Sequence, residues 1–257
     1  MKKLSLLALA MLLTGCGTSQ VSKNQTISPK DVSAISINSQ AQFAVSRVVV
    51  LANGVAEIMN SLNAKSILVG RDISSTEEEL TDIPIVTSGH QVLSEKVIAL
   101  KPDLVIIDAS TGPKSAIAQI KAAGINVLQT PESWTLADIS KKVAAVAAAI
   151  GAEQQGNLLN QALASQIQTS TISSKPRIAF LYLRGTSSIY LIGGPGSGAD
   201  SLISAIGAID VGAQSLPNPF NTLTAESLAT LNPDVILLMT NGLQSVGGIS
   251  GLLKLPG

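Results

Sequence analysis

His90 is the only histidine in this chain of 257 residues, and it lies in the polar stretch Thr87 to Gln91, just ahead of a predicted helix. A neutral imidazole is a good ligand for iron. Tyr190 is one of two tyrosines and stands at the end of a short predicted strand, before a glycine-rich stretch. A phenol has a reference pKa of about 10, so it ionises at neutral pH only beside a cation such as ferric iron. The two side chains could therefore clamp one iron from opposite sides if the fold brought them together.

Each of these residues also has a plain structural explanation. A single surface histidine more often has no ligand, and a strand tyrosine can simply pack on the rim of a cleft. Tyr182 competes with Tyr190 as a ligand, but it lies in the middle of an apolar strand and is predicted to be core. The elements that surround these residues must decide between the explanations.

The N-terminus predicts where the protein works. Lys2 and Lys3 precede the apolar run Leu4 to Leu12, and the sequence Leu-Thr-Gly-Cys, ending at Cys16, follows it. This order is that of a signal peptide over residues 1–15. Its ending resembles the bacterial lipobox, which implies that Cys16 is lipidated and becomes the new N-terminus; the alternative is an ordinary secretory peptide. We therefore expect an extracytoplasmic protein of the bacterial cell envelope, anchored to the membrane by lipid.

Composition excludes several classes of function. The chain has 17 basic and 17 acidic residues, and loss of Lys2 and Lys3 with the leader leaves 15 basic ones, so no basic stripe indicates a nucleic-acid partner. No second apolar run of about 18 residues predicts a membrane span. With Cys16 lipidated, no thiol remains for a disulfide or a cysteine metal site. No nucleophile motif or carboxylate cluster indicates an enzyme.

Strands and helices alternate once a polar N-terminal segment ends. Residues 16–45 are rich in Ser, Thr, Gln and Asn and are predicted to form a flexible tether. The next part, 46–151, is predicted to be a first α/β lobe with a parallel sheet. Its short apolar runs predict buried strands, and helical spacing lies between them. The strands are expected at 47–51, 67–70, 104–107 and 126–129, and the helices at 55–62, 115–123 and 136–150.

A second α/β lobe is predicted over 175–257. A helix over 152–174 is expected to join it to the first lobe as a rigid connector. Strands are predicted at 177–183, 189–192 and 235–238, and a helix at 199–206. The glycine-rich stretch 193–198 lacks the Gly-Lys-Ser/Thr ending of a phosphate-binding loop, so it is interpreted as a tight turn that lines a cleft.

The two predicted lobes share an internal repeat. Leu93 to Ile107 and Ala225 to Leu238 each contain a glutamate, a short helix, the motif Leu-x-Pro-Asp and an apolar strand. In both, the glutamate precedes the proline by seven residues. The proline ends the helix and the aspartate helps the turn into the strand. Two such stretches at matched spacing, one in each half, indicate two related lobes.

Two α/β lobes joined by a helix, behind a lipobox, resemble the substrate-binding lipoproteins of ABC importers, in the class that serves cobalamin, siderophores and haem. The Leu-x-Pro-Asp strand entries carry this resemblance, and segments 180–185, 198–203 and 247–257 are similar to haem-binding, HmuT-like members. The resemblance covers residue 46 to the end. It implies an α/β fold of two Rossmann-like lobes joined by a long connecting helix, the class III periplasmic-binding-protein fold. Members normally continue past Leu-x-Leu-Pro-Gly with another strand and helix, so the second lobe is expected to be C-terminally incomplete, with uncovered apolar surface.

The resemblance implies a binding protein and not an enzyme. It would capture ferric haem, its transported ligand, between the lobes as a monomer and deliver it to the permease and ATPase of an ABC importer. His90 and Tyr190 would be the axial ligands of the haem iron. Arg71 and Arg184, each just after a predicted strand, would contact the haem propionates. The alternative for each arginine is an ordinary solvated or structural role.

Glu95 and Glu226 are a second pair implied by the resemblance. In this class one exposed acidic residue on each lobe docks against arginines of the permease, and the repeat gives these two glutamates equivalent positions. The alternative is a favourable effect of a glutamate near a helix N-terminus. Other functions also stay open, namely a carrier of a ferric siderophore or a corrinoid in the same importer class, or an envelope enzyme on the same fold.

Overall fold

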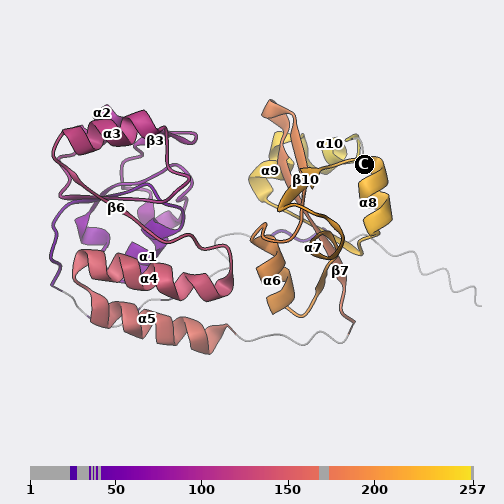
Figure 1. The fold of residues 1–257 in the computed structure, drawn as a ribbon, viewed down its shortest axis with the longest axis horizontal. Coiled ribbons are helices and arrows are strands. Elements are labelled where there is room, and N and C mark those ends of the chain that lie inside the picture. The colour runs from indigo at the N-terminus through magenta and orange to yellow at the C-terminus, as the bar shows by residue number, and fades with distance from the viewer. Residues whose placement is uncertain are drawn as a thin grey trace, which may run out of the picture.

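The computed structural model describes residues 24–27, 35, 37, 39, 42–167 and 174–255. Two α/β lobes lie side by side (Figure 1). The predicted signal peptide, Cys16 and most of the predicted tether lie outside the described residues. The end of that tether belongs to the first lobe, because Ile37 is buried in its core and Phe43 and Val45 pack against the same cluster. None of the described helices is long and apolar enough to cross a membrane.

The first lobe is built on a parallel sheet with the strand order β2-β1-β5-β6. Its strands are β1 (Val48–Val50), β2 (Leu68–Gly70), β5 (Leu104–Ile107) and β6 (Asn126–Gln129). Every residue of β1 and β5 is buried. Val48 and Val50 point into one core cluster and Val49 into another, so the sheet is covered on both faces. The prediction of parallel strands buried on both faces is confirmed here.

Three helices contribute to the core on one face of this sheet and two to the core on the other. The first set is α1 (Val55–Ser61), α4 (Leu136–Ile150) and α5 (Glu153–Gln166); the second is α2 (Ser94–Ala99) and α3 (Lys114–Ala122). The lobe also contains two short 3-10 helices and a two-stranded hairpin. These are η2 (Lys65–Ile67), η3 (Glu78–Leu80), β3 (Thr87–Ser88) and β4 (Gln91–Val92).

The predicted connecting helix packs along the first lobe. α5 lies beside α4 (Figure 1), and Leu159 joins the first core cluster. A Cβ added at Gly156 would come within 2.5 Å of the Ala147 side chain, so only glycine allows this close approach. The helix ends at Gln166, and residues 168–173, which lead towards the second lobe, lie outside the described residues.

The second lobe has a mixed sheet with the order β10-β8-β7-β11, and β9 also pairs with β7. Its strands are β7 (Arg177–Arg184), β8 (Ile189–Gly193), β9 (Ile209–Asp210), β10 (Phe220–Thr222) and β11 (Val235–Leu238). β7 and β8 are antiparallel because only the short 3-10 helix η4 (Gly185–Ser187) and one further residue join them, too little chain for a parallel crossover. The parallel sheet predicted for the first lobe is confirmed, and the second lobe has a mixed sheet in place of the parallel one that a Rossmann-like lobe implies.

The helices of the second lobe are α6 (Ala199–Ala205), α7 (Val211–Ser215), α8 (Ala225–Leu231), α9 (Thr240–Ser245) and α10 (Gly248–Leu252). Among the strands of the described residues, β11 pairs only with β7 and stands at the edge of the sheet. Three of its residues are substantially exposed: Val235 by 44%, Ile236 by 39% and Leu237 by 40%. The uncovered apolar surface expected on the second lobe is therefore present at this edge.

The internal repeat has matching hydrogen bonds in the two lobes. Asp103 Oδ2 accepts the backbone N–H of Arg47 at 2.9 Å, and the guanidinium of Arg47 donates to a carbonyl at the end of α2 at 2.7 Å. In the second lobe Asp234 Oδ2 accepts the backbone N–H of Arg177 at 2.9 Å, and the guanidinium of Arg177 donates to a carbonyl at the end of α8 at 2.8 Å. The aspartate therefore ties the turn to the first strand of its lobe, with an arginine partner that sequence analysis did not identify.

Candidate ligand-binding site

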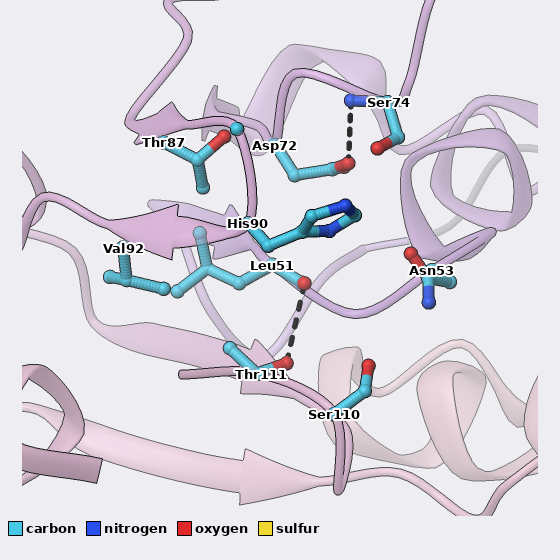
Figure 2. A pocket seen from close by; sticks show the side chains of 10 residues that line it. Leu51, Asn53, Asp72, Ser74, Thr87, His90, Val92, Ser110 and Thr111 are labelled. Carbon is cyan, nitrogen blue, oxygen red and sulfur yellow. Dashed lines mark hydrogen bonds between the residues drawn. The ribbon is translucent and has the colours of Figure 1, made fainter. Parts of the chain in front are cut away.

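Polar side chains gather at the carboxyl edge of the first sheet. Asn53 follows β1, Asp72 follows β2, and Ser110 and Thr111 follow β5. Together with His90 they line a cavity of about 50 Å³, and Figure 2 shows the imidazole between Asp72 on one side and Ser110 and Thr111 on the other. Ligands of α/β sheets bind at this edge. Because a water occupies about 30 Å³ of liquid, the cavity is a niche beside His90 and not the whole site of a large ligand.

His90 lies in the turn of the β3–β4 hairpin and is exposed. Gly89, at φ 56°, has the left-handed backbone that a two-residue hairpin turn requires. The hairpin is tied to the lobe, because the N–H of Val92 donates to the carbonyl of Gly112 at 2.9 Å. The sequence predicts only a polar loop here. The dipeptide Ser88-Gly89 is the weak signal that could have indicated the hairpin.

Arg184, at the end of β7 in the second lobe, forms a hydrogen bond with His90 Nε2 in the first lobe. A guanidinium can only donate, so Nε2 is the acceptor of this bond through its lone pair and carries no proton. That lone pair is the one with which an imidazole binds iron. The structure thus brings together one predicted iron ligand and one predicted propionate contact, from opposite lobes.

The two tyrosines point to opposite faces of the second sheet. Tyr190 pairs with Leu183 across the antiparallel ladder, and both belong to the same core region. Tyr182 precedes Leu183, so it points to the other face, which also carries Arg184. Its ring packs edge-on against Phe220, with centroids 5.8 Å apart. Contrary to the expectation from sequence, Tyr190 is turned towards the core, and Tyr182 is the tyrosine that shares a face with Arg184.

Arg71 is 6% exposed, and its guanidinium is used inside the first lobe. It donates to the carbonyl of Leu80 at 2.9 Å and to that of Ser75 at 2.6 Å, and so holds the loop after β2 closed. These donors face backbone carbonyls of the lobe, so they favour the structural alternative for Arg71 over the predicted propionate contact. Nothing in the local sequence separates it from Arg184, since each follows an apolar strand.

A buried carboxylate stabilises the floor of the niche. Asp108 accepts the backbone N–H of Asn53 at 2.9 Å and the hydroxyls of Ser110 at 2.7 Å and Thr111 at 2.9 Å. Burial by itself raises the pKa of Asp108, but these hydrogen bonds outweigh burial and leave the pKa lowered. Lys142, buried in α4, donates to the carbonyl of Asn53 at 2.6 Å. This network holds the loops that border His90 in one arrangement.

Glu57 lies in the first turn of α1, and one of its carboxyl oxygens is buried without a hydrogen-bond partner among the described residues. Its burial, followed by a hydrogen bond to Glu77, raises its pKa to about 8. Asp72 adds a smaller repulsion in the same direction. The pair carries no signal in the sequence, because the two glutamates come from separate segments and match no motif.

Glu95 and Glu226 are both exposed, and each lies in the first turn of its helix, α2 or α8. Within the described part of the chain neither forms an ion pair. The two glutamates, which occupy equivalent positions in the sequence repeat, therefore also occupy equivalent positions in the first turns of the two helices.

The molecule has two lobes, each built on a sheet covered by helices. Polar side chains line a niche where the lobes meet, and a hydrogen bond joins the lobes there. This architecture is that of a two-lobe ligand-binding protein. The family model described as "Periplasmic binding protein" matches residues 48–257. The chain belongs to this family. It is 27% identical, over 256 residues, to the uncharacterized ABC transporter substrate-binding lipoprotein YvrC of Bacillus subtilis (strain 168); the match covers 94% of this chain and 80% of YvrC.

Similar solved structures are haem-binding proteins. HmuT is 34% identical with a TM-score of 0.74, covering 83% of this chain and 72% of HmuT. RhuT from Roseiflexus sp. RS-1, in apo form, is 34% identical with a TM-score of 0.78. The match covers 83% of this chain and 84% of RhuT. BhuT, in complex with two haems, is 30% identical with a TM-score of 0.69. The match covers 82% of this chain and 83% of BhuT. The predicted fold class and the predicted resemblance to substrate-binding proteins of ABC importers are confirmed.

Proposed function

We propose that this protein captures ferric haem between its lobes and delivers it to the permease and ATPase of an ABC importer. The observation that carries the proposal is the hydrogen bond between His90 and Arg184, which joins the lobes at an imidazole lone pair able to bind iron. The names of HmuT, RhuT and BhuT as haem-binding proteins support the same ligand.

His90 is the proposed axial ligand from the first lobe. Its imidazole must be neutral at Nε2 to accept from Arg184, and a neutral imidazole is also the form that binds iron. The network of Asp108 and Lys142 supports the neighbouring loops, so the niche beside the ligand needs little rearrangement.

Tyr182 is the proposed axial ligand from the second lobe, in place of the predicted Tyr190. Tyr182 shares a face with Arg184, whereas Tyr190 packs on the core. Solved variants of HmuT replace a tyrosine and an arginine that are two positions apart in that protein, the spacing of Tyr182 and Arg184 here. A ferric ion favours the phenolate form of a tyrosine, and a nearby guanidinium adds to the effect.

Arg184 is the proposed contact for a haem propionate. Once iron takes the lone pair of His90, the guanidinium loses its acceptor and is left beside a dianionic ligand. A bidentate pair with a propionate would satisfy it.

Anchoring and docking complete the proposal. Lipidation of Cys16 would hold the protein outside the cytoplasm at the membrane that contains the permease. Glu95 and Glu226, one on each lobe and both exposed, would pair with arginines of that permease.

A visible-absorption titration with ferric haem tests the proposal. The protein is secreted as the Cys16→Ser variant to avoid lipid, and it is compared with His90→Ala, Tyr182→Phe and the matched control Tyr190→Phe. Saturable one-to-one binding with a shift of the Soret band is expected, with weaker binding and a changed spectrum in the first two variants only. If Tyr190→Phe alters the band and Tyr182→Phe does not, the original tyrosine prediction is restored.

Absence of saturable haem binding by the folded protein would reject the haem proposal. The same titrations with a ferric siderophore and with a corrinoid would then identify which of the other ligands of this importer class binds. Consumption of any of these ligands with release of a product would instead indicate an enzyme.

A further inference from the structure

Trp134 is the only tryptophan of the chain, and it is 53% exposed. It belongs to none of the four core clusters of the described residues. The backbone around it is nevertheless held on both sides. Thr130 donates to the last carbonyl of β5 at 2.8 Å, Glu132 accepts a backbone N–H from the loop after β5 at 3.0 Å, and Thr135 caps α4. The chain thus fixes a large aromatic side chain and leaves half of it uncovered.

This tryptophan lies where the first lobe touches the second. It follows β6, so it stands at the same edge of the sheet as the niche beside His90. Two residues further on, the N–H of Leu136 donates to the hydroxyl of Ser201 in the second lobe at 3.0 Å. Figure 1 shows the corresponding approach of α4 to α6, well separated from β3 beside the His90 turn.

Gly198, which precedes α6, brings the backbone of the second lobe beside the indole. A Cβ added at Gly198 would lie 3.9 Å from Cε3 of Trp134, in ordinary contact. Gly198 has φ 87°, a conformation that glycine adopts readily, and itself presents no side chain to the ring. About half of the Trp134 surface is thus exposed at a point where the two lobes meet.

We propose that Trp134 is a wall of the ligand site that recognises the flat, conjugated body of a tetrapyrrole independently of its iron. This inference rests on the proposed function and deepens it. An indole offers a rigid apolar face that packs well against another conjugated ring. A ferric siderophore surrounds its iron with polar oxygens, and a corrin ring bears substituents on both faces, so both offer less flat apolar surface. His90 would select the iron and Trp134 the macrocycle.

The structural alternative is that Trp134 only packs against the start of α4. It precedes the N-cap Thr135, the position from which an apolar side chain often contacts the first turns of a helix. Leucine can make that contact but cannot replace an aromatic face. Phenylalanine retains a smaller aromatic face, so the two substitutions separate the roles.

The test is a titration with metal-free protoporphyrin IX, followed by its absorption and emission, on the secreted Cys16→Ser protein. His90→Ala should lose more affinity for ferric haem than for this iron-free probe, because its imidazole serves the iron, although it also loses the hydrogen bond to Arg184. Trp134→Leu should bind it about tenfold or more weakly, and Trp134→Phe should recover most of the affinity. Leu253→Ala is the control, since it removes an apolar side chain that is 80% exposed just after α10 in the second lobe. Thermal midpoints are measured for every variant.

The outcomes separate this inference from the proposed function. Parent protein that binds ferric haem saturably, with Trp134→Leu binding protoporphyrin as tightly as the parent, overturns the inference and leaves the haem function standing. Parent protein that binds haem but not the metal-free probe overturns it too, because iron alone then carries recognition. Loss of probe binding in Trp134→Phe together with a lowered thermal midpoint assigns the residue a structural role only. Failure of the parent to bind haem rejects the proposed function itself.

Discussion

The strands β5 and β11 occupy the same place in the internal repeat but differ in burial. β5 lies between β1 and β6 and is buried along its length, whereas β11 pairs only with β7 and is largely exposed. The preceding turns are alike, each with its Asp–Arg hydrogen bonds to the neighbouring strand. A repeated sequence therefore reproduces the local structure, while the burial of its strand depends on which neighbouring elements the rest of the lobe supplies.

The largest expected difference between the lobes is in the free energy of unfolding that is lost when a strand side chain is shortened to alanine. Ile106 of β5 is fully buried, and its repeat equivalent in β11, Leu237, is 40% exposed. Ile106→Ala should lower the free energy of unfolding by about 3–4 kcal/mol through lost burial and a residual cavity. Leu237→Ala should cost less than about 1 kcal/mol, because much of that side chain already contacts water. Urea unfolding followed by circular dichroism measures both, and equal losses would contradict the difference in cover.

The next effect is a pH dependence expected from the first lobe. Burial raises the pKa of Glu57 in the folded protein to about 8, from its ordinary value of 4.5. The protonated form is favoured by folding, so its stabilising contribution is complete below about pH 4.5 and is lost as pH rises through 8. Glu57→Gln should remove this part of the dependence and stabilise the protein by about 1–3 kcal/mol at pH 9 relative to the parent. Unfolding midpoints from pH 4 to 9 provide the check, and parallel curves for the two proteins would refute the assignment.

A smaller and equal effect is expected at the matched turns. Asp103→Ala and Asp234→Ala each remove a carboxylate that accepts a backbone N–H at 2.9 Å in an exposed turn. Each should cost about 1–2 kcal/mol of unfolding free energy, since a charge-assisted hydrogen bond is lost. The two losses are compared in the same denaturant series. A loss confined to one lobe would show that the two turns are alike in geometry only.

The smallest effect on the isolated protein is expected at the docking glutamates. Glu95→Gln and Glu226→Gln alter exposed first-turn residues and should change stability by less than about 1 kcal/mol. Haem affinity should stay unchanged. Growth of the source bacterium with haem as its iron source should nevertheless slow in both variants. Normal growth in the double variant would assign the glutamates a helix-end role alone.

The secondary structure follows closely from local patterns of apolar residues. The strands at 126–129 and 235–238 and the helix at 136–150 have the bounds predicted from sequence. These segments are long or strongly patterned enough for local preference to determine their type. The β3–β4 hairpin and the antiparallel pair β7–β8 were not predicted, because two-residue strands leave little pattern and strand direction depends on the length and path of the connection.

The candidate site was only partly predictable. His90 stood out as the only imidazole, and Arg184 as a cation after a strand. The two residues lie 94 positions apart along the chain, and their contact forms only where the two lobes meet. Arg71 and Arg184 each follow an apolar strand, but their hydrogen bonds differ. The loop after β2 folds back over Arg71 and supplies carbonyl acceptors, whereas Arg184 bonds to His90 of the other lobe. Trp134 belongs to no sequence motif. Its position beside the second lobe is seen only in the tertiary structure.

By itself, the sequence determined the alternation of strands and helices, the repeat of Leu-x-Pro-Asp in two lobes, and the side chains able to bind iron, because these depend on residue type and short-range spacing. Only the tertiary structure decided which side chains meet. Strand register turned Tyr190 to the core and left Tyr182 on the face of Arg184. One-residue alternation along a strand reverses the face of every side chain, and the partner strand that selects the face lies beyond any local pattern.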